Sequence, residues 1–392
     1  MANDTQMHIV ESVMQVKNRP LIGILTITLE PLEDGYQVYA DLGEEIEALD
    51  VGLVVFTPYG IDWMKETVRG LILKDGGWEP GVTRLPDAVY NRLYGTNSKT
   101  VAKLAKTLGN KCVFNHENRL SKIQVAETLH SSKLKANLPE TSEFCWGQFA
   151  DMLRKHNQVI LKPIYGNYGF NIYKVVQTES RYKVYFETLR KPHCSFTELE
   201  QLRNWIEGML VKPKPRPYLV QQYIEPLKLR GRFFDLRLLA QRDGAGKWAV
   251  TAVMSRINRL NYLISNLVYR ITDGEDLLKD LGLPHLIRPL SEMSVEAAKL
   301  LTRKLGMFAE ISVDWIVDQS YKPWIIEING KPRKDLFEDY ADDELLRAIH
   351  LRPISYGRYA ALKKANRSHQ GISRPVQGIH RPAAKWIVTT SR

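Results

Sequence analysis

Two carboxylates and one carboxamide near the C-terminal end of the chain have the types and spacing of a metal site. Residues 308–334 (FAEISVDWIVDQSYKPWIIEINGKPRK) alternate in polarity on both sides of a short connection, which predicts two β-strands. Glu327 and Asn329 lie two positions apart and share one face of the second strand, and Asp314 can reach that face from the first. Such oxygen donors suit Mg²⁺ that enters with the phosphates of a nucleotide.

Acidic residues on strands are also common on solvated faces, and an isolated D…ExN pattern favours that reading. The setting here is apolar, because tryptophan and isoleucine occur on both strands. Carboxylates on buried strands need a partner or a metal. We therefore expect Asp314, Glu327 and Asn329 to be metal ligands.

A second candidate segment, VILKPIYGNYGFNIYKV from residue 159, predicts a strand, a glycine-containing loop and another strand. This order differs from the strand–loop–helix of dinucleotide folds and P-loops, and neither GxGxxG nor GxxxxGK[ST] occurs. A loop with Gly166, Asn167 and Gly169 can offer backbone N–H groups to phosphates, and Lys162 on the entering strand can neutralise their charge. The other reading is a surface hairpin with a lysine at its edge.

The stretch FDLRLLAQ predicts a strand on which Asp235 and Arg237 share a face. An acid facing ribose hydroxyls and an arginine facing phosphate oxygens would explain this pair, and so would a surface cross-strand ion pair. Arg256 closes the next predicted strand, and Asn266 is a further polar candidate in the segment after it. The nine histidines do not cluster, and no convincing Ser-His or Cys-His arrangement is present.

The composition indicates an ordinary globular protein. The 392 residues allow two or three domains with sizeable cores, and 44% are hydrophobic and 25% charged. No apolar run approaches the ~20 residues of a membrane span, and MANDTQMHIVESVMQ lacks a secretory core, so we expect a cytoplasmic location. Cys112, Cys145 and Cys194 are too widely spaced for a disulfide framework or a metal pair, and we expect them to be small buried hydrophobes.

The formal net charge of +11 belongs to the end of the chain. Residues 345–392 contain ten lysines and arginines and no acidic residue, which leaves 45 basic against 44 acidic residues before them. A basic tail can bind nucleic acid, an anionic polymer or an acidic protein surface. A solvated, disordered extension is an equally good reading.

The first part of the chain predicts a small α/β domain. Apolar runs at residues 20–28, 51–57 and 85–93 are typical of buried strands, and a helical pattern at 42–49 precedes the second. Tyr90, Asn91 and Arg92 end the third strand, where α/β sheets place ligand-binding loops. An exposed polar strand end explains these three residues equally well.

The rest of the chain adds elements around the candidate residues. Ser121 is a good N-cap for a helix with apolar residues at helical spacing. The later patterns predict a turn at 138–141, an edge strand at 182–189, a helix at 196–210, a strand at 218–224, strands at 234–242 and 248–256 joined by a turn, helices at 296–305 and 342–362, and a disordered end at 366–392.

Taken in order, a lysine strand, a Gly loop, a strand ending in QQYI, a DxR strand, an arginine and D…ExN form the layout of the ATP-grasp superfamily. The motifs VYNR, LPET, LKPIYGNYGFNI, FDLRLLAQRDGAGKW and WIIEINGKPR together resemble the spore-coat-associated ATP-grasp family called YheC/YheD, over about residues 20–362. The resemblance implies a mixed α/β (α+β) ATP-grasp fold in three parts: an N-terminal α/β domain (20–112), a lid or central subdomain (113–222) and a C-terminal antiparallel-sheet subdomain with the metal site (223–365). A leader (1–19) and a basic tail (366–392) lie outside the resemblance.

The resemblance also implies roles for single residues around an ATP molecule held between the last two subdomains. Lys162 would contact the α- and β-phosphates, and the loop with Gly166, Asn167 and Gly169 would cover the triphosphate. The adenine hinge would be formed by Gln222, Tyr223 and Ile224, and Asp235 would face the ribose. Arg237 and Arg256 would approach the transferring phosphate, Asn266 and Lys331 would lie near an acyl phosphate, and one or two Mg²⁺ ions would be held by Asp314, Glu327 and Asn329. The loop departs from the usual GSxGxG at Asn167 and Asn171, and the paired glycines usual after Asn266 are absent.

The implied activity is ATP-dependent ligation of a carboxylate to an amine through an acyl phosphate. Its substrates would be small molecules or peptides, spore coat proteins would be partners, and the location would be the cytoplasm or the spore coat, without specific nucleic-acid binding. Two alternatives use the same fold: phosphoryl transfer to a hydroxyl group, and a non-catalytic nucleotide-binding coat component assembled through the basic tail. A full metal and phosphate set disfavours the last, because a scaffold has no physical need for it.

Overall fold

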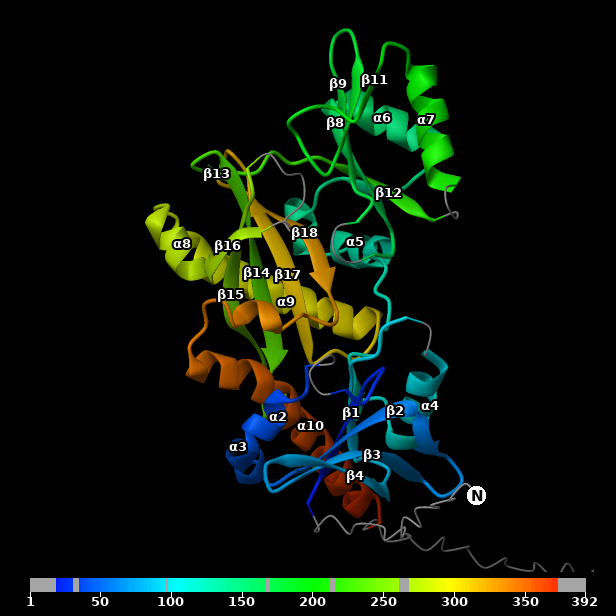
Figure 1. The fold of residues 1–392 in the computed structure, drawn as a ribbon, viewed down its shortest axis with the longest axis vertical. Coiled ribbons are helices and arrows are strands. Elements are labelled where there is room, and N and C mark those ends of the chain that lie inside the picture. Colours follow the sequence, from blue (N-terminus) through cyan, green and yellow to red (C-terminus); the bar gives the residue numbers. More distant parts are fainter. Residues whose placement is uncertain are drawn as a thin grey trace, which may run out of the picture.

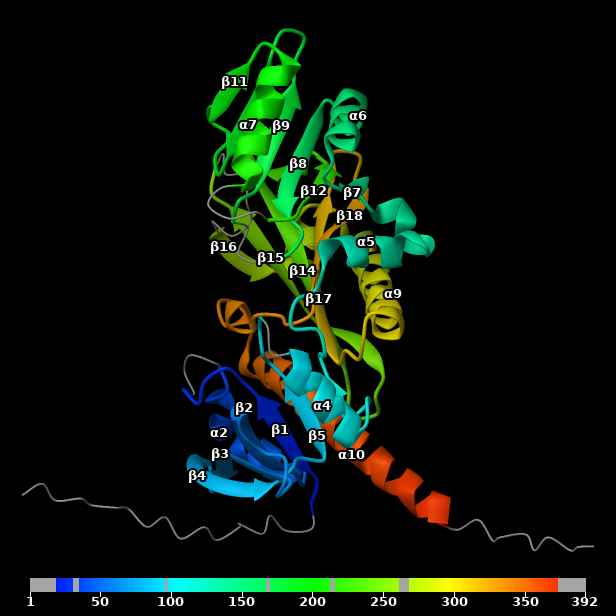
Figure 2. The same ribbon diagram turned by 90° about the vertical axis from the view of Figure 1, so that its right-hand side faces the viewer.

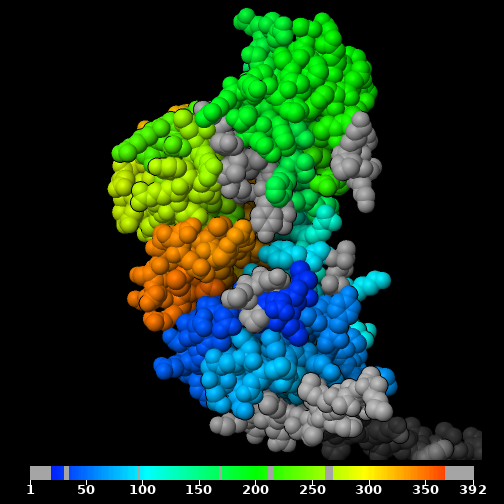
Figure 3. Space-filling view, in the orientation of Figure 1, coloured from blue at the N-terminus to red at the C-terminus, as the bar shows by residue number. Residues whose placement is uncertain are grey.

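The computed structural model describes residues 19–30, 35–95, 98–166, 170–211, 216–260 and 268–372. The strands in these ranges form three six-stranded sheets: an N-terminal sheet (β1–β6), a central sheet (β7–β12) and a C-terminal sheet (β13–β18). The C-terminal sheet lies between the other two along the long axis of the molecule (Figure 1). In the space-filling view the central sheet and its helices form a lobe at one end (Figure 3).

The N-terminal sheet has the order β4-β3-β2-β1-β5-β6. Its apolar strands β1 (Leu21–Leu25), β2 (Gly52–Asp62), β5 (Ala88–Asn91) and β6 (Val113–Phe114) are parallel, as expected for buried apolar runs. Helices α2 (Val38–Asp41), α3 (Gly43–Ala48) and α4 (Ser98–Leu108) accompany it. Strands β3 (Thr67–Lys74) and β4 (Gly77–Arg84) form an antiparallel hairpin on one edge, which the sequence patterns did not predict.

The central sheet has the order β11-β10-β9-β8-β12-β7, and its strands pair antiparallel. Its strands are β7 (Thr141–Glu143), β8 (Gln158–Pro163), β9 (Tyr173–Gln177), β10 (Tyr182–Phe186), β11 (Cys194–Phe196) and β12 (Tyr218–Gln222). Helices α6 (Trp146–His156) and α7 (Leu199–Val211) bury their apolar sides against one face of it. Leu161 belongs to that core, so its neighbour Lys162 points to the opposite face.

The C-terminal sheet has the order β16-β15-β14-β17-β18, with β13 (Lys228–Leu229) beside β14. The other strands are β14 (Arg232–Arg242), β15 (Trp248–Asn258), β16 (Val268–Asp273), β17 (Glu310–Val317) and β18 (Pro323–Asn329), and every pair is antiparallel, as expected. Helices α8 (Gly274–Asp280) and α9 (Ile287–Lys304) cover one face. Figure 2 shows α9 beside the strands of this sheet. The buried Trp315 anchors this core, since its indole Nε1 donates to Ser294 Oγ at 3.0 Å.

Helix α5 (Lys122–His130) begins at the predicted N-cap, where Ser121 Oγ accepts from the backbone N–H of Gln124. Its apolar residues Val125 and Leu129 lie in the core of the C-terminal sheet, although we expected residues 113–222 to belong to the lid. The short helix η1 (Lys133–Asn137) packs there too, through Leu134. The chain therefore enters the central sheet only at β7.

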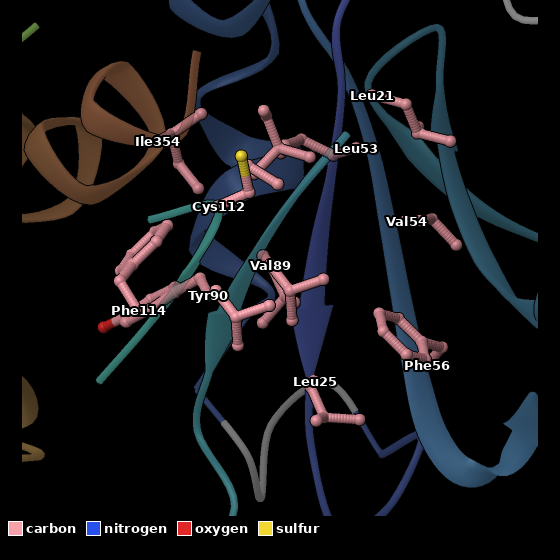
Figure 4. Close-up of a cluster of buried hydrophobic side chains, with 14 of the residues drawn as sticks. Leu21, Leu25, Leu53, Val54, Phe56, Val89, Tyr90, Cys112, Phe114 and Ile354 are labelled. Atoms are coloured by element: carbon pink, nitrogen blue, oxygen red, sulfur yellow. The ribbon is translucent and has the colours of Figure 1, made fainter. Parts of the chain in front are cut away.

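The last helix, α10 (Asp343–Ile372), connects the C-terminal and N-terminal sheets. Ile349 packs on the C-terminal sheet, and Ile354 packs beside Cys112 in the N-terminal core (Figure 4). The helix continues through Pro353, which cannot donate to the carbonyl of Ile349 four residues earlier. Gln241 Nε2 donates to that carbonyl instead, at 2.8 Å.

Three smaller expectations differ from the structure. Helix α10 extends to Ile372, beyond residue 366 where we expected the tail, and residues 373–392 and the leader up to residue 18 lie outside the described residues. Cys112 is buried as expected, but Cys145 is exposed and Cys194 is only half-buried. Among the described residues, no helix is long and apolar enough to cross a membrane.

Candidate active site

A row of charged side chains crosses the face of the C-terminal sheet that is opposite to α9. Strand register places Asp235 opposite Arg256, Arg237 opposite Asp314, and Asp314 opposite Glu327. Paired residues in an antiparallel sheet point to the same side, so all five side chains share one face. Asn329 joins them two residues beyond Glu327, opposite Ser312. The structure thus brings together the three expected metal ligands and both arginines.

The arginines and aspartates of this row form buried ion pairs. Arg237 binds Asp314 through two hydrogen bonds of 2.7 and 2.8 Å, and Arg256 binds Asp235 through two of 2.8 and 2.5 Å. Arg256 also donates to Asp314 at 3.0 Å, which joins the pairs into one network. Burial alone would raise the pKa of Asp314, but the two guanidinium groups outweigh it and hold the pKa at about 2. Asp314 is therefore ionised at neutral pH.

This network gives Asp235 a partner that differs from the expected one. We expected its carboxylate to face a ribose, but both of its oxygens accept hydrogen bonds from Arg256. The cross-strand ion pair was the other reading of the DxR pattern, and the structure contains it in a buried form and with different partners. Asp235 pairs with Arg256 on β15, and Arg237 pairs with Asp314 on β17, rather than with one another.

Lys162 approaches this face from the central sheet. Its Nζ donates to the carbonyl of Ile326 at 3.2 Å, and the side chain is almost fully buried. Burial lowers the pKa of Lys162 to about 8; Glu327 and Asp314 act in the opposite direction, and nearby Lys122 adds to the lowering. Because burial disfavours the charged form of Lys162 in the free protein, a polyanionic ligand beside Nζ would strongly stabilise that charged form.

Lys122 is a site residue that sequence reasoning missed. It is the first residue of α5, and its Nζ donates to the carbonyl of Gly166 at 2.8 Å and lies 3.2 Å from Glu327 Oε1. Lys122 therefore links the glycine loop to the proposed metal ligand. The only signal in the sequence was its position directly after the N-cap Ser121, which places a cation at the start of a helix.

The residues expected to form the adenine hinge lie at the end of β12. The backbone N–H groups of Gln222 and Tyr223 donate to the carbonyls of Glu140 and Gln158, so they already have partners within the protein. Ile224 is buried beside them. The sequence did not indicate Lys174, whose Nζ lies 3.4 Å from the centre of the Tyr223 ring.

Lys331, which we expected near an acyl phosphate, lies away from this row of charged residues. Lys331 is buried at the boundary with the N-terminal sheet, where its Nζ donates to the Leu93 carbonyl and, at 2.9 Å, to Asn118 Oδ1. Asn167, Gly169 and Asn266 lie outside the described residues.

The second reading of Tyr90, Asn91 and Arg92, an exposed polar strand end, is wrong. Tyr90 and Asn91 are fully buried. Tyr90 OH donates to Glu310 Oε1, and the carboxamide of Asn91 donates to Asn118 Oδ1 at 2.8 Å. Strand β5 therefore ends in contacts with the C-terminal sheet.

The oxygen atoms of Asp314, Glu327 and Asn329 suit a metal ion that enters the site already bound to a nucleotide. Among the described residues, no group of three His, Cys, Asp or Glu side chains could hold a metal ion. The face offers two carboxylates and one carboxamide, of which Glu327 is partly exposed. A magnesium ion keeps several water or phosphate oxygens, so a bound triphosphate would supply the remaining ligands.

A cavity of about 1000 Å³ lies between α5, the central sheet and β18. Lys162 and Gln222 line it on the side of the central sheet, and Glu327 and Trp324 line it on the side of β18. The lysine-bearing and glutamate-bearing sheets therefore enclose a space rather than packing without a gap.

The three-sheet architecture and this two-sided site define an ATP-grasp protein. A family model described as YheC/D-like ATP-grasp matches residues 110–360. The chain belongs to this family.

Several known proteins are similar to this chain. The endospore coat-associated protein YheD of Bacillus subtilis (strain 168) is 25% identical over 344 residues, which are 81% of this chain and 74% of YheD. YheC of the same organism is 22% identical over 313 residues, covering 75% and 84%. The solved structure of the ATP-grasp ligase PsnB with minimal precursor, Mg and ADP covers 86% of this chain and 98% of PsnB, with 15% identity and a TM-score of 0.50.

Proposed function

We propose that this protein is an ATP-dependent carboxylate–amine ligase that works through an acyl phosphate. One observation carries the proposal: Lys162 of the central sheet reaches the backbone beside Glu327, on the sheet face that also holds Asp314, Arg237 and Arg256. A lysine on one side and carboxylates with arginines on the other form the surroundings that a metal-bound triphosphate requires.

In this proposal the protein acts by positioning and charge. Lys162 and Lys122 hold the phosphate chain, and Arg237 and Arg256 stabilise the charge that develops as a substrate carboxylate attacks the γ-phosphorus. Mg²⁺ held by Asp314, Glu327 and Asn329 would neutralise phosphate charge when bound. Attack by the carboxylate breaks the bond between the γ-phosphorus and the β–γ bridging oxygen and gives an acyl phosphate and ADP. An amine then attacks the acyl carbon and loses a proton, the C–O bond to phosphate breaks, and an amide and free phosphate form.

The ion pairs of the free site add a condition. Both oxygens of Asp314 are bound by guanidinium groups, and Glu327 is paired with Lys122. A bound triphosphate offers the cationic groups another anion, which frees carboxylate oxygens for the metal. Nucleotide and metal are therefore expected to bind together, each more weakly without the other.

The test is the variant Glu327→Gln. It keeps the size of the side chain and removes the charge, so ADP release should fall at least about a hundredfold while the melting temperature stays close to that of the parent. The matched control is Glu292→Gln, which breaks only an exposed pair with Arg288 on α9 and should leave ADP release unchanged. Full ADP release by Glu327→Gln would remove the metal assignment.

The product distinguishes the proposed reaction from phosphoryl transfer. ATP and Mg²⁺ are incubated with a panel of amino acids and acidic peptides, which offer both carboxylates and amines. An amide with release of free phosphate supports ligation, and a stable phosphoester supports phosphotransfer to a hydroxyl.

We further propose that the protein associates with the spore coat, as the names of YheD and YheC describe for those relatives. The basic end of the chain would make this contact, while the ligase site works in the cytoplasm before assembly. Deleting residues 373–392 keeps the described length of α10, Asp343–Ile372, and should reduce coat association without changing ADP release.

A further inference from the structure

The segment that follows β18 carries the proposed metal ligand Asn329 and is held from outside its own sheet. Three consecutive backbone carbonyls after Asn329 accept hydrogen bonds from side chains at the end of the N-terminal sheet. Gly330 O accepts from Asn115 Nδ2 at 3.1 Å, Lys331 O accepts from Tyr94 OH at 3.0 Å, and Pro332 O accepts from Arg92 at 3.2 Å.

Asn115 also holds the neighbouring strand. Its Oδ1 accepts from the backbone N–H groups of Ala309, at 2.9 Å, and Glu310, at 3.4 Å, where β17 begins. One buried carboxamide thus connects the start of β17 to the residue directly after Asn329. Asn115 adopts a left-handed backbone conformation with φ of 57°, which asparagine and aspartate tolerate better than most residues.

The segment after Asn329 has little room to move. A Cβ atom added to Gly330 would lie 2.9 Å from the Phe308 ring, so the backbone lies closely against the residues that precede β17. On the other side, Arg92 contacts Glu310 at 3.4 Å in addition to the Pro332 carbonyl. The direction of the peptide behind Asn329 therefore depends on contacts from the N-terminal sheet.

We propose that Asn115, Tyr94 and Arg92 are positioning residues for the metal site, because they fix the backbone that orients Asn329. This inference rests on the proposed function, which assigns Asn329 to Mg²⁺. Groups that orient metal ligands typically change metal affinity by 10- to 100-fold when they are lost. The N-terminal sheet then has a role in nucleotide binding although these residues do not need to touch the nucleotide.

Two variants test this. Only Tyr94→Phe carries little risk to the fold, because Asn115→Asp places a carboxylate at a fully buried position beside the Gly330 carbonyl. Tyr94→Phe removes only a hydroxyl group from a side chain that is 42% exposed. Asn115→Asp keeps the oxygen that accepts from Ala309 and suits the same left-handed backbone, but it replaces the donor to Gly330 O with an acceptor. The readout is the Mg²⁺ concentration that half-saturates the enhancement of ADP binding, measured by calorimetry and independent of turnover.

We expect this concentration to rise about tenfold in both variants, with ADP affinity in EDTA unchanged. A loss of stability alone would reduce the amount of binding protein without shifting the concentration. The control Arg347→Gln breaks an ion pair of 3.0 Å with Glu45 between α10 and α3, away from this segment, and should leave the concentration unchanged.

The reference variant Asn329→Ala distinguishes failure of the positioning role from failure of the metal assignment. If Asn329→Ala raises the half-saturating Mg²⁺ concentration but Tyr94→Phe and Asn115→Asp do not, the positioning role is wrong and the proposed site stands. An equal shift in Arg347→Gln would also overturn the positioning role, since it would indicate general loosening between the sheets. If Asn329→Ala has no effect, the metal assignment itself fails, and the inference fails with it.

Discussion

Lys162 should link nucleotide binding to proton uptake. Burial lowers its pKa in the free protein to about 8, from an ordinary value of 10.5. A triphosphate beside Nζ would favour the charged form and return the pKa toward 10.5. At pH 8 the free lysine is about half protonated and the bound lysine is fully protonated, so binding should take up about half a proton, and almost none at pH 6.5.

The size of the effect follows from the same pKa. A return from about 8 to 10.5 corresponds to roughly 3 kcal/mol of additional interaction with the charged lysine. The lowered pKa of Lys162 also makes the stability of the free protein depend on pH. The unfolded chain binds this proton more tightly than the folded protein between pH 8 and 10.5, so Lys162 makes the free energy of unfolding rise with pH across that window.

Calorimetry can measure this uptake directly. ADP is titrated at pH 8 in buffers of different ionisation enthalpy, and the slope of the observed enthalpy against the buffer enthalpy gives the number of protons. Lys174 also has a pKa lowered to about 8 by burial, so Lys162→Met is measured in parallel and subtracted. Equal proton uptake by the parent and by Lys162→Met would refute the assignment of Lys162 to the phosphates.

Three further outcomes are expected. Arg237→Met removes the main partner of a buried carboxylate and should destabilise the protein by about 3 kcal/mol in urea unfolding, whereas the double variant with Asp314→Leu should lose less than the two single variants together. Ile354→Ala should lower the free energy of unfolding by about 3 kcal/mol, because this α10 side chain is fully buried in the N-terminal core. Its control, Leu362→Ala, lies at a 38% exposed position and should change the urea midpoint little. Ser121→Ala removes the N-cap of α5 and should cost about 1 kcal/mol, with weaker ADP binding because Lys122 is the next residue; unchanged ADP binding would contradict that role of the cap.

Most strands around the site could be predicted from the sequence. Alternation in residues 308–334 and 234–256 predicts β14, β15, β17 and β18, and it also predicts that Glu327 and Asn329 share a face. These predictions depend only on the two-residue period of a strand, which is a local property of the chain. The hairpin of β3 and β4 was missed because its residues, GWEPGVTR in β4, are half-exposed and include glycine and proline, which are rare in strands.

The partners of the charged residues could not be predicted. Arg237 binds Asp314, which is 77 residues away, and Arg256 binds Asp235, which is 21 residues away. Lys122 joins the site from a helix start, and Lys174 lies against the Tyr223 ring from a strand; the local sequence patterns around both give no sign of a ligand. Strand order and the docking of one sheet on another decide these contacts, and no short-range pattern in the sequence encodes them.

The sequence by itself determined which side chains point to the same side of each strand and, through its order of motifs, the family to which the chain belongs. The tertiary structure alone decided that Asp235 binds an arginine, that α10 joins two sheets, and that Asn115 holds the backbone behind Asn329. The physical reason is distance along the chain. Side-chain direction on a strand follows from backbone geometry over two residues, whereas Asn115 and Gly330, 215 positions apart, meet only where the N-terminal and C-terminal sheets pack together.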